Sequence, residues 1–322
     1  MPVTDITTDP ENLTMTLVAD AAAPVERLWQ AFTTPDQLAR FWGPPGWPAT
    51  FTSFDLRPGG RVDYHMTSPQ GQRSGGSWEV LSVDEGRSFE VNDSFVGDDG
   101  EKLEGFPSMR MVFSFEPTDA GSRLTNTTYF TSAEALEQVV AMGAIEGSRM
   151  AMNQLDVVLQ DLRDYAEGKG TRTEILDDQH VRITRLIEGP RELVWRAHHE
   201  PELLKTWMLG PDGWQMVECE VGDEYRYIWQ QGDDESTRFG FEGETVLSEP
   251  TWRAVTTERM IGVDAPGALN DLQLYEEAGA TLLTLVIEYA DKEMRDMILA
   301  TGMTEGMEAS YARLEETVLA RA

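Results

Sequence analysis

The sequence predicts two α+β domains in tandem, and three observations support this fold class. The chain has 322 residues, which suits two domains of about 150 residues better than a single core. It repeats itself at a shift of 166 residues. In each copy, helical patterns enclose a long run of strand patterns joined by tight turns, which favours an antiparallel sheet packed on helices over a doubly wound parallel sheet.

The internal repeat consists of matched residues that begin near position 24 and position 190. The identities in the first block pair Pro24, Glu26, Trp29, Ala31, Pro35 and Leu38 with Pro190, Glu192, Trp195, Ala197, Pro201 and Leu204. After one inserted residue, the turn sequence 43–47 (GPPGW) matches 210–214 (GPDGW), and Glu146-Gly147 later matches Glu305-Gly306. A repeat of this length indicates two complete domains, not a solenoid. We predict domains at 1–168 and 173–322, joined by a linker at 169–172.

Each copy begins with a strand and a helix. Residues 13–19 (LTMTLVA) and 181–188 (VRITRLIE) alternate as strands do. Val25, Leu28, Trp29 and Phe32 then form one apolar helical stripe. A second short helix is predicted to begin at Pro35, with Thr34 as its capping residue and Gln37 completing a capping box.

The remainder of each copy is predicted as strands followed by one long helix. Turn sequences such as 57–60 (RPGG) and 97–100 (GDDG) separate the strands. In the first copy the closing helix shows a stripe of Ser148, Met152, Leu155, Leu159 and Leu162. In the second copy Met307, Tyr311, Leu314 and Val318 repeat this spacing.

Composition excludes several classes of function. The net charge is −31, with 26 acidic and 12 basic residues up to Gly170 and 31 acidic and 14 basic residues beyond it. Such a surface repels phosphate backbones and anionic lipids, so we expect no nucleic-acid binding, and no run is long enough for membrane insertion. Cys219 is the single cysteine, and the N-terminus shows no secretory pattern. We therefore expect a cytoplasmic protein.

These motifs resemble the SRPBCC/START-like superfamily. The pattern P-x-x-x-x-W-x-A, then P-x-x-L, then a tryptophan before G-P-x-G-W is similar to the branch named after the activator of the heat-shock protein 90 ATPase. The sequences 59–64 (GGRVDY) and 306–314 (GMEASYARL) also fit this branch. The resemblance implies a helix-grip fold, in which a curved antiparallel sheet wraps a long C-terminal helix around a cavity for a lipid-like or other apolar small molecule.

We predict that aromatic residues of both copies line these cavities. Trp42, Trp47, Trp207 and Trp214 are candidates for the cavity mouths, although Trp47 and Trp214 also suit plain packing at the start of a strand. Strand alternation places Tyr64 on one face, and Tyr225, Tyr227 and Trp229 on the equivalent face of the second copy. The remaining candidate ligand contacts are Trp78, Met150, Met303 and Glu258. Adaptable methionine side chains on the predicted helices suit either the core or a cavity.

His198 takes the position that Phe32 has in the first copy. This pattern is typical of a half-buried histidine, with a polar group aimed into the second cavity as the alternative. His198 and His199 are adjacent and diverge on a helix, so no metal site is predicted. The chain shows no phosphate-binding loop or dinucleotide motif, so we predict no cofactor, and no base is placed beside Cys219.

The leading functional hypothesis is binding of a small hydrophobic ligand without obvious catalysis. A stress-related co-chaperone that contacts a chaperone partner through its acidic surface is one alternative. The sequence lacks the Asn-x-Asn-Asn-Trp-His-Trp motif of the eukaryotic co-chaperone, which argues against that role. A cyclase- or hydrolase-type enzyme that uses His198, Tyr227 and Glu258 is the other alternative, and it requires these side chains to converge.

Overall fold

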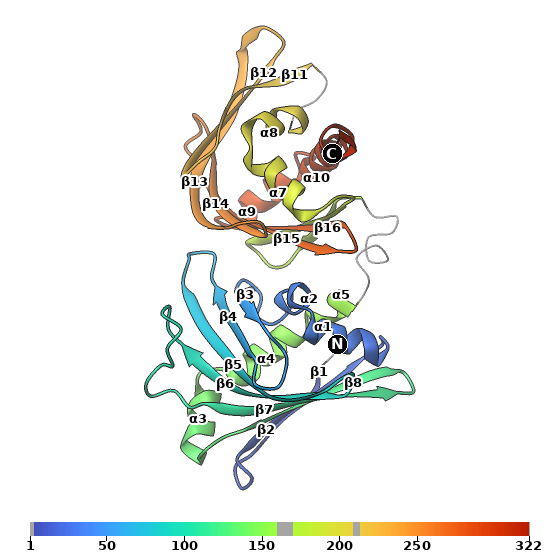
Figure 1. Ribbon diagram of the computed structural model, residues 1–322. Coiled ribbons are helices and arrows are strands. Elements are labelled where there is room, and N and C mark those ends of the chain that lie inside the picture. The colour runs from blue at the N-terminus through green and yellow to red at the C-terminus, as the bar shows by residue number, and fades with distance from the viewer. Residues whose placement is uncertain (1–2, 160–169, 209–212, 322) are drawn as a thin grey trace. The chain divides into compact units, whose positions relative to one another are not determined.

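The computed structural model describes residues 3–159, 170–208 and 213–321. The chain divides into two compact units, Met1–Asp161 and Leu162–Ala322, each with its own antiparallel sheet of eight strands and its own helices (Figure 1). The predicted tandem of helix-grip domains is thus confirmed. The predicted boundary at residue 168 and the turn at 210–212 lie outside the described residues.

The first sheet has the strand order β1-β2-β8-β7-β6-β5-β4-β3. Its strands are β1 (Val3–Asp9), β2 (Thr14–Ala21), β3 (Ala49–Phe54), β4 (Arg61–Thr67), β5 (Arg73–Asp84), β6 (Ser88–Val96), β7 (Met109–Thr118) and β8 (Gly121–Tyr129). The helices are α1 (Val25–Thr33), α2 (Pro35–Ala39), α3 (Ala133–Ala141), α4 (Ala144–Met152) and α5 (Leu155–Leu159).

The second sheet has the equivalent order β11-β12-β13-β14-β15-β16-β10-β9. Its strands are β9 (Arg172–Ile175), β10 (His180–Ile187), β11 (Trp214–Glu220), β12 (Glu224–Gln231), β13 (Asp234–Glu249), β14 (Arg253–Met260), β15 (Ala268–Glu277) and β16 (Ala280–Glu288). The helices are α7 (Arg191–His199), α8 (Pro201–Trp207), α9 (Lys292–Leu299), α10 (Met303–Thr317) and a short 3-10 helix η1 (Leu319–Arg321).

In the first domain the sheet curves around the helices, which lie on its concave side (Figure 1). The core between them contains the α1 residues Leu28 and Phe32, the strand residues Val91 and Phe113, and Leu155 of α5, all almost fully buried. Alternation along the strands turns one set of side chains toward this core. The helical stripe predicted on α1 therefore packs as expected, with Leu28, Ala31 and Phe32 buried.

Several local predictions were wrong. The first closing helix is not continuous: α4 ends at Met152 and α5 begins at Leu155, although Met152, Leu155 and Leu159 still face the core. α2 begins at Pro35 as predicted, but the Thr34 side chain makes no capping hydrogen bond. Four elements were not predicted, namely the edge strands β1 and β9 and the helices α3 and α9. These edge strands alternate too weakly to stand out, since only Val3 of β1 and no residue of β9 is fully buried.

Candidate functional site

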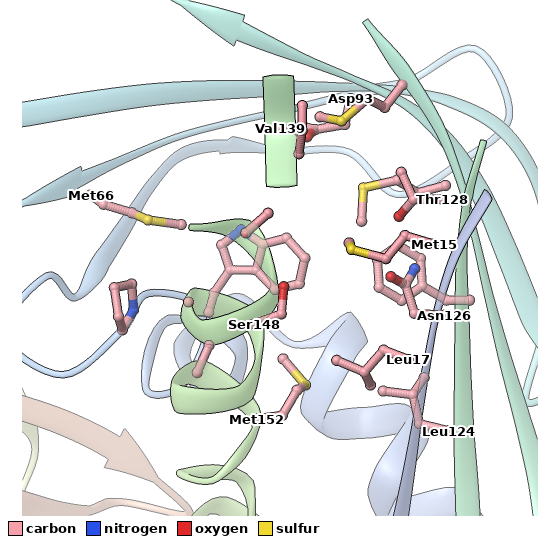
Figure 2. A pocket seen from close by; sticks show the side chains of 18 of the residues that line it. Met15, Leu17, Met66, Asp93, Leu124, Asn126, Thr128, Val139, Ser148 and Met152 are labelled. Carbon is pink, nitrogen blue, oxygen red and sulfur yellow. The ribbon is translucent and has the colours of Figure 1, made fainter. Parts of the chain in front are cut away.

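A cavity of about 260 Å³ lies between the first sheet and α4 (Figure 2). Leu17 of β2 and Leu124 of β8 lie on one wall, Met66 of β4 lies across from them, and α4 presents Ser148 and Met152. Val139 of α3 and Asp93 of β6 lie at one end of the view. The cavity therefore lies where the family resemblance led us to expect one, between the sheet and a closing helix.

Small residues on α4 explain why the space between helix and sheet is hollow. Ala144, Gly147, Ser148 and Ala151 all line the cavity and follow each other at helical spacing, so one face of α4 carries almost no side-chain volume. Close packing would otherwise fill the interior of a domain of this size. The hollow is therefore encoded by the sequence of one helical face.

Methionines and aromatic rings form most of the wall. The lining methionines are Met15, Met66, Met109, Met111 and Met152. The lining aromatic residues are Trp42, Tyr64, Phe95 and Phe113. Methionine side chains adapt their shape and make favourable sulfur contacts with aromatic rings. Such a wall suits a predominantly apolar ligand, particularly an aromatic one.

Asp93 is the charged side chain among the residues that line the cavity. Asp93 is only 9% exposed, and its Oδ1 atom lies 3.5 Å from the hydroxyl oxygen of Tyr64. Burial raises the pKa of Asp93 to about 7, although the Tyr64 hydroxyl, the backbone N–H of Ser94 and the nearby Trp78 indole favour the ionised form and limit the rise. Asp93 is therefore poised to change charge near neutral pH.

Tyr64 reaches Asp93 because the adjacent strand carries a glycine. Gly76 of β5 pairs with Tyr64, and a Cβ atom at this glycine would lie 2.3 Å from the ring carbon Cζ. The tyrosine ring therefore crosses β5 where no side chain obstructs it. Burial raises the pKa of Tyr64 well above its usual value, and the indole N–H groups of Trp42 and Trp78 act in the opposite direction on its oxygen.

Two polar side-chain atoms of the residues that line the cavity make no hydrogen bond of normal geometry within the described chain. They are the indole nitrogen of Trp42 and the hydroxyl of Thr128, and both residues line the cavity. Thr128 is only 2% exposed and lies on β8 beside Asn126 (Figure 2). Buried polar groups usually have partners, so these two atoms mark where a ligand or water has something to bond to.

The second domain has a carboxylate at the same place in its sheet. In the first sheet Val62, Trp78 and Asp93 are paired in succession across β4, β5 and β6. In the second sheet Tyr225 pairs with Gly243, and the register between β13 and β14 places Gly243 opposite Glu258. In the repeat, Gly59 and Tyr64 match Gly222 and Tyr227, so Val62 corresponds to Tyr225. Asp93 and Glu258 are therefore equivalent, because each lies two strands away, in register with one of these matched residues.

Glu258 is surrounded by neutral donors. The hydroxyl of Tyr225 lies 3.5 Å from its Oε2 atom and donates to the carbonyl oxygen of Thr257 at 2.8 Å. Burial raises the pKa of Glu258, while hydrogen bonds from Asn270 and Tyr225 oppose the rise. Burial and the nearby Glu258 raise the pKa of Tyr289 to about 12. A carboxylate with tyrosine neighbours is thus common to both domains.

The helical faces of the two domains differ in volume. Aligning Glu146-Gly147 with Glu305-Gly306 places Met303, Met307 and Tyr311 of α10 where α4 has Ala144, Ser148 and Met152. The Met303 sulfur lies 3.8 Å from the hydroxyl oxygen of Tyr289, and Tyr311 packs on Trp207 with ring centroids 5.9 Å apart. Larger side chains therefore occupy part of the space that is hollow in the first domain.

Two of the five residues predicted for the first cavity line it, Trp42 and Tyr64. Trp78 is fully buried behind them, with its ring centroid 4.9 Å from that of Trp42. Trp47 precedes β3 by two residues and is not among the lining residues. Met150 is 39% exposed, and its neighbours Ala151 and Met152 line the cavity instead. Helix phase explains this difference, because adjacent residues point about 100° apart.

In the second domain the structure brings Tyr225, Tyr227 and Glu258 together, because Tyr225 contacts the carboxylate and the charge of Glu258 acts on the pKa of both tyrosines. Met303 joins this region through Tyr289. Trp229 stacks on Phe239 at 5.4 Å.

The remaining predicted residues of this domain lie elsewhere. Trp214 begins β11 as predicted and packs edge-on against Phe239. Trp207 is 3% exposed, and its indole N–H donates to the carbonyl oxygen of Ala197 at 2.9 Å. His198 lies beside Trp207 and Tyr311.

His198 is a buried neutral histidine. Its Nδ1–H donates to the carbonyl oxygen of Val194 at 2.8 Å, and its buried Nε2 atom has no hydrogen-bond partner within the described chain. Burial lowers its pKa to about 4, and the nearby His199 adds to this effect. The first domain places Phe32 here, so the histidine replaces a core ring.

Sequence reasoning missed Asp93, Thr128 and Asn126, together with all five lining methionines. A signal for Asp93 was present: residues 89, 91, 93 and 95 (FEVNDSF) alternate as the inward face of a strand, and a carboxylate interrupts that apolar face. For Thr128 and Asn126 no such signal exists, because polar residues also fill the outward positions of β8.

The described part of the chain contains no group of three or more residues that could hold a metal ion. Within the same residues, no helix is long and apolar enough to cross a membrane. Burial raises the pKa of the Cys219 thiol, which works against a nucleophilic role.

Known structures resemble this chain over about half of its length or over nearly all of it. Protein Ms6760 from Mycobacterium smegmatis is 46% identical, and the match covers 49% of this chain and 98% of that protein with a TM-score of 0.47. A protein from Arthrobacter aurescens is 34% identical over 49% of this chain and 91% of its own length, with a TM-score of 0.47. DynU16, from the dynemicin biosynthetic locus, is 14% identical over 95% of this chain and 99% of its own, with a TM-score of 0.35. No match was found among functionally curated proteins.

A family model matches the chain twice, at residues 22–160 and 188–318. Together these segments include six of the eight strands of each sheet, both closing helices and all the cavity-lining residues except Met15 and Leu17. The chain therefore belongs to the family of activator of Hsp90 ATPase homolog 1-like proteins, and it contains two copies of the family domain.

Proposed function

We propose that the first domain binds a small, predominantly apolar molecule in the cavity between its sheet and α4. The observation that carries the proposal is the hollow of about 260 Å³ itself, which exists because α4 presents Ala144, Gly147 and Ser148 to the sheet. A cavity of about 150 Å³ is known to hold benzene, so this one suits a molecule of about two fused rings. The adaptable methionine wall supports the same size class.

The second domain supplies the control for this proposal. Its residues Met303 and Met307 stand where the first domain has Ala144 and Ser148, so this helix–sheet arrangement tolerates both larger side chains. The double substitution Ala144→Met and Ser148→Met should fill the cavity while preserving the fold. Ala141→Met adds the same side chain at an exposed position of α3 and serves as the matched control.

Binding is best measured by NMR on protein labelled at the methionine methyl groups, titrated with naphthalene and 3-ethylindole. We expect saturable shifts of Met15, Met66, Met109, Met111 and Met152. The exposed methionines Met142 and Met297 should not respond. The filled variant should lose these shifts, and the Ala141→Met variant should keep them. Unchanged spectra in the wild-type protein would refute the proposal, as would equal binding by the filled variant.

Catalysis and a chaperone partner stay predictions without a supporting observation. His198 lies with Trp207 and Tyr311, and the contacts of Glu258 are with Tyr225 and Asn270. A cytoplasmic location likewise stays a prediction.

A further inference from the structure

We propose that the polar end of the first cavity selects ligands in which a protonated amine is attached to an aromatic body, with the ammonium group donating to Asp93. This inference rests on the proposed function, because it names the class of molecule that the same cavity takes. It concerns one corner of the cavity, where Asp93 and Tyr64 meet.

The charge of the cavity favours a cation. Asp93 is the charged side chain among the lining residues, and no lysine, arginine or histidine is found among them. A buried carboxylate without a cationic partner is costly, and a ligand that supplies the positive charge removes that cost. A carboxylate ligand would instead place two like charges in one low-dielectric space, which is strongly unfavourable.

The protein groups around Asp93 do not include a cationic partner for its carboxylate. The groups that favour its ionised form are all neutral, namely the Tyr64 hydroxyl, the Ser94 backbone N–H and the nearby Trp78 indole, whose nitrogen makes no hydrogen bond of normal geometry within the described chain. They are insufficient to keep the carboxylate fully ionised, since its pKa is about 7. An ammonium group would complete the set, because a charge-assisted hydrogen bond is roughly twice as strong as a neutral one.

The surrounding rings suit both parts of such a ligand. Trp42 and Tyr64 lie edge to face, with ring centroids 6.1 Å apart. A cation near aromatic faces gains further electrostatic stabilisation. Phe113 and the lining methionines provide the apolar surface for the ligand's ring. The net charge of −31 also raises the local concentration of cations over anions near the protein.

The second domain repeats the carboxylate beside a tyrosine hydroxyl, with Glu258 half-buried. Glu258 stands at the same ladder position as Asp93, and Tyr225 crosses Gly243 as Tyr64 crosses Gly76. The two tyrosines are not equivalent, because Tyr225 corresponds to Val62 and Tyr64 corresponds to Tyr227. The pair of a tyrosine and a carboxylate therefore recurs with a tyrosine from a different position of the strand. Each sheet therefore carries a carboxylate that lies 3.5 Å from a tyrosine hydroxyl.

The test compares four ligands that share one indole body in the full chain. Tryptamine carries an ammonium group, tryptophol a hydroxyl, 3-ethylindole no polar group on its side chain, and indole-3-acetate a carboxylate. Dissociation constants come from the methionine methyl shifts at pH 8, where Asp93 is mostly ionised. We expect tryptamine to bind at least about tenfold more tightly than 3-ethylindole and tryptophol, and indole-3-acetate to bind most weakly.

Asp93→Asn should remove the preference for tryptamine over 3-ethylindole while 3-ethylindole still binds, which shows that the variant is folded. Glu258→Gln removes the equivalent carboxylate of the other domain and should leave the preference intact. Equal affinities for tryptamine and 3-ethylindole, tighter binding of tryptophol, or an unchanged preference in Asp93→Asn would each overturn the inference and leave the proposed function standing. If none of the four ligands shifts the lining methionines, the proposed function fails with it.

Discussion

Asp93 on β6 and Glu258 on β14 occupy equivalent positions in two separate sheets, and each carboxylate lies 3.5 Å from a tyrosine hydroxyl. The tyrosines differ: Tyr64 comes from the position of Tyr227, and Tyr225 from that of Val62. A glycine on the intervening strand admits the ring in both cases. The two domains therefore keep the acid and vary the side chains around it.

The stability of the first domain should depend on the protonation of Asp93. Its pKa is about 7 in the folded protein and near 3.8 when unfolded, so the folded state holds a proton that the unfolded state has lost between these values. This contribution is fully present below about pH 4 and is lost as pH rises to 7. Relative to Asp93→Asn, the free energy of unfolding should fall by roughly 1 kcal/mol per pH unit.

The measurement is urea unfolding between pH 4 and pH 8, followed at the Met109 methyl group so that the first domain is observed separately. Tyr64 is the other titratable side chain in the cavity wall, and its raised pKa keeps it neutral throughout this range. A pH-independent difference between the two proteins would contradict the assignment.

Protonation of His198 should have the opposite effect on the second domain, whose stability should fall as the pH falls. Its pKa is about 4 in the folded protein against 6.5 for a free histidine, so the unfolded state gains a proton first as pH falls. The domain should lose roughly 1 kcal/mol per pH unit between about pH 6.5 and pH 4. His198→Phe, which installs the residue found in the first domain, should remove this part of the loss. Unfolding followed at the Met307 methyl group tests this, and an identical pH profile in the variant would rule it out.

Gly76→Ala should displace Tyr64. The added Cβ would lie 2.4 Å from the tyrosine hydroxyl oxygen, and Tyr64 is nearly buried. We expect a loss of roughly 1–3 kcal/mol in the free energy of unfolding, together with weaker tryptamine binding.

Gly147→Ala is the matched control, because its Cβ would meet nothing within 4 Å. It replaces a glycine inside α4 and should stabilise the domain by roughly 0.5–1 kcal/mol. Chemical denaturation of both variants gives the comparison. Equal effects of the two substitutions would show that the close approach at Gly76 is unimportant.

Two buried hydroxyls on β8 should respond differently to removal. The Ser122 hydroxyl donates to the carbonyl oxygen of Ala23 at 2.7 Å, whereas the Thr128 hydroxyl has no partner within the described chain. Ser122→Ala should cost roughly 1 kcal/mol, and Thr128→Val should be neutral or stabilising in the ligand-free protein. Unfolding free energies of the two variants decide the matter. A Thr128→Val variant as unstable as Ser122→Ala would indicate a bound water on Thr128.

Much of the fold followed from local patterns. The stripe on α1, the Pro35 start of α2 and the strand alternation around Tyr64 all depend on neighbouring residues, so they are visible in the sequence. The break between α4 and α5 was missed, because the apolar spacing continues across it. The exposed position of Met150 was missed too, since an apolar side chain alone does not show which way it faces.

The sequence by itself determined the duplication, the α+β class and the family resemblance, because these depend on residue identity and on periods of two and 3.6. Only the tertiary structure decided which residues line the cavity. Asp93 meets Tyr64 across two strands, and the hollow depends on small side chains of α4 facing a sheet assembled from distant segments. Strand register and helix phase set these relations, and both are consequences of packing between residues far apart in the chain.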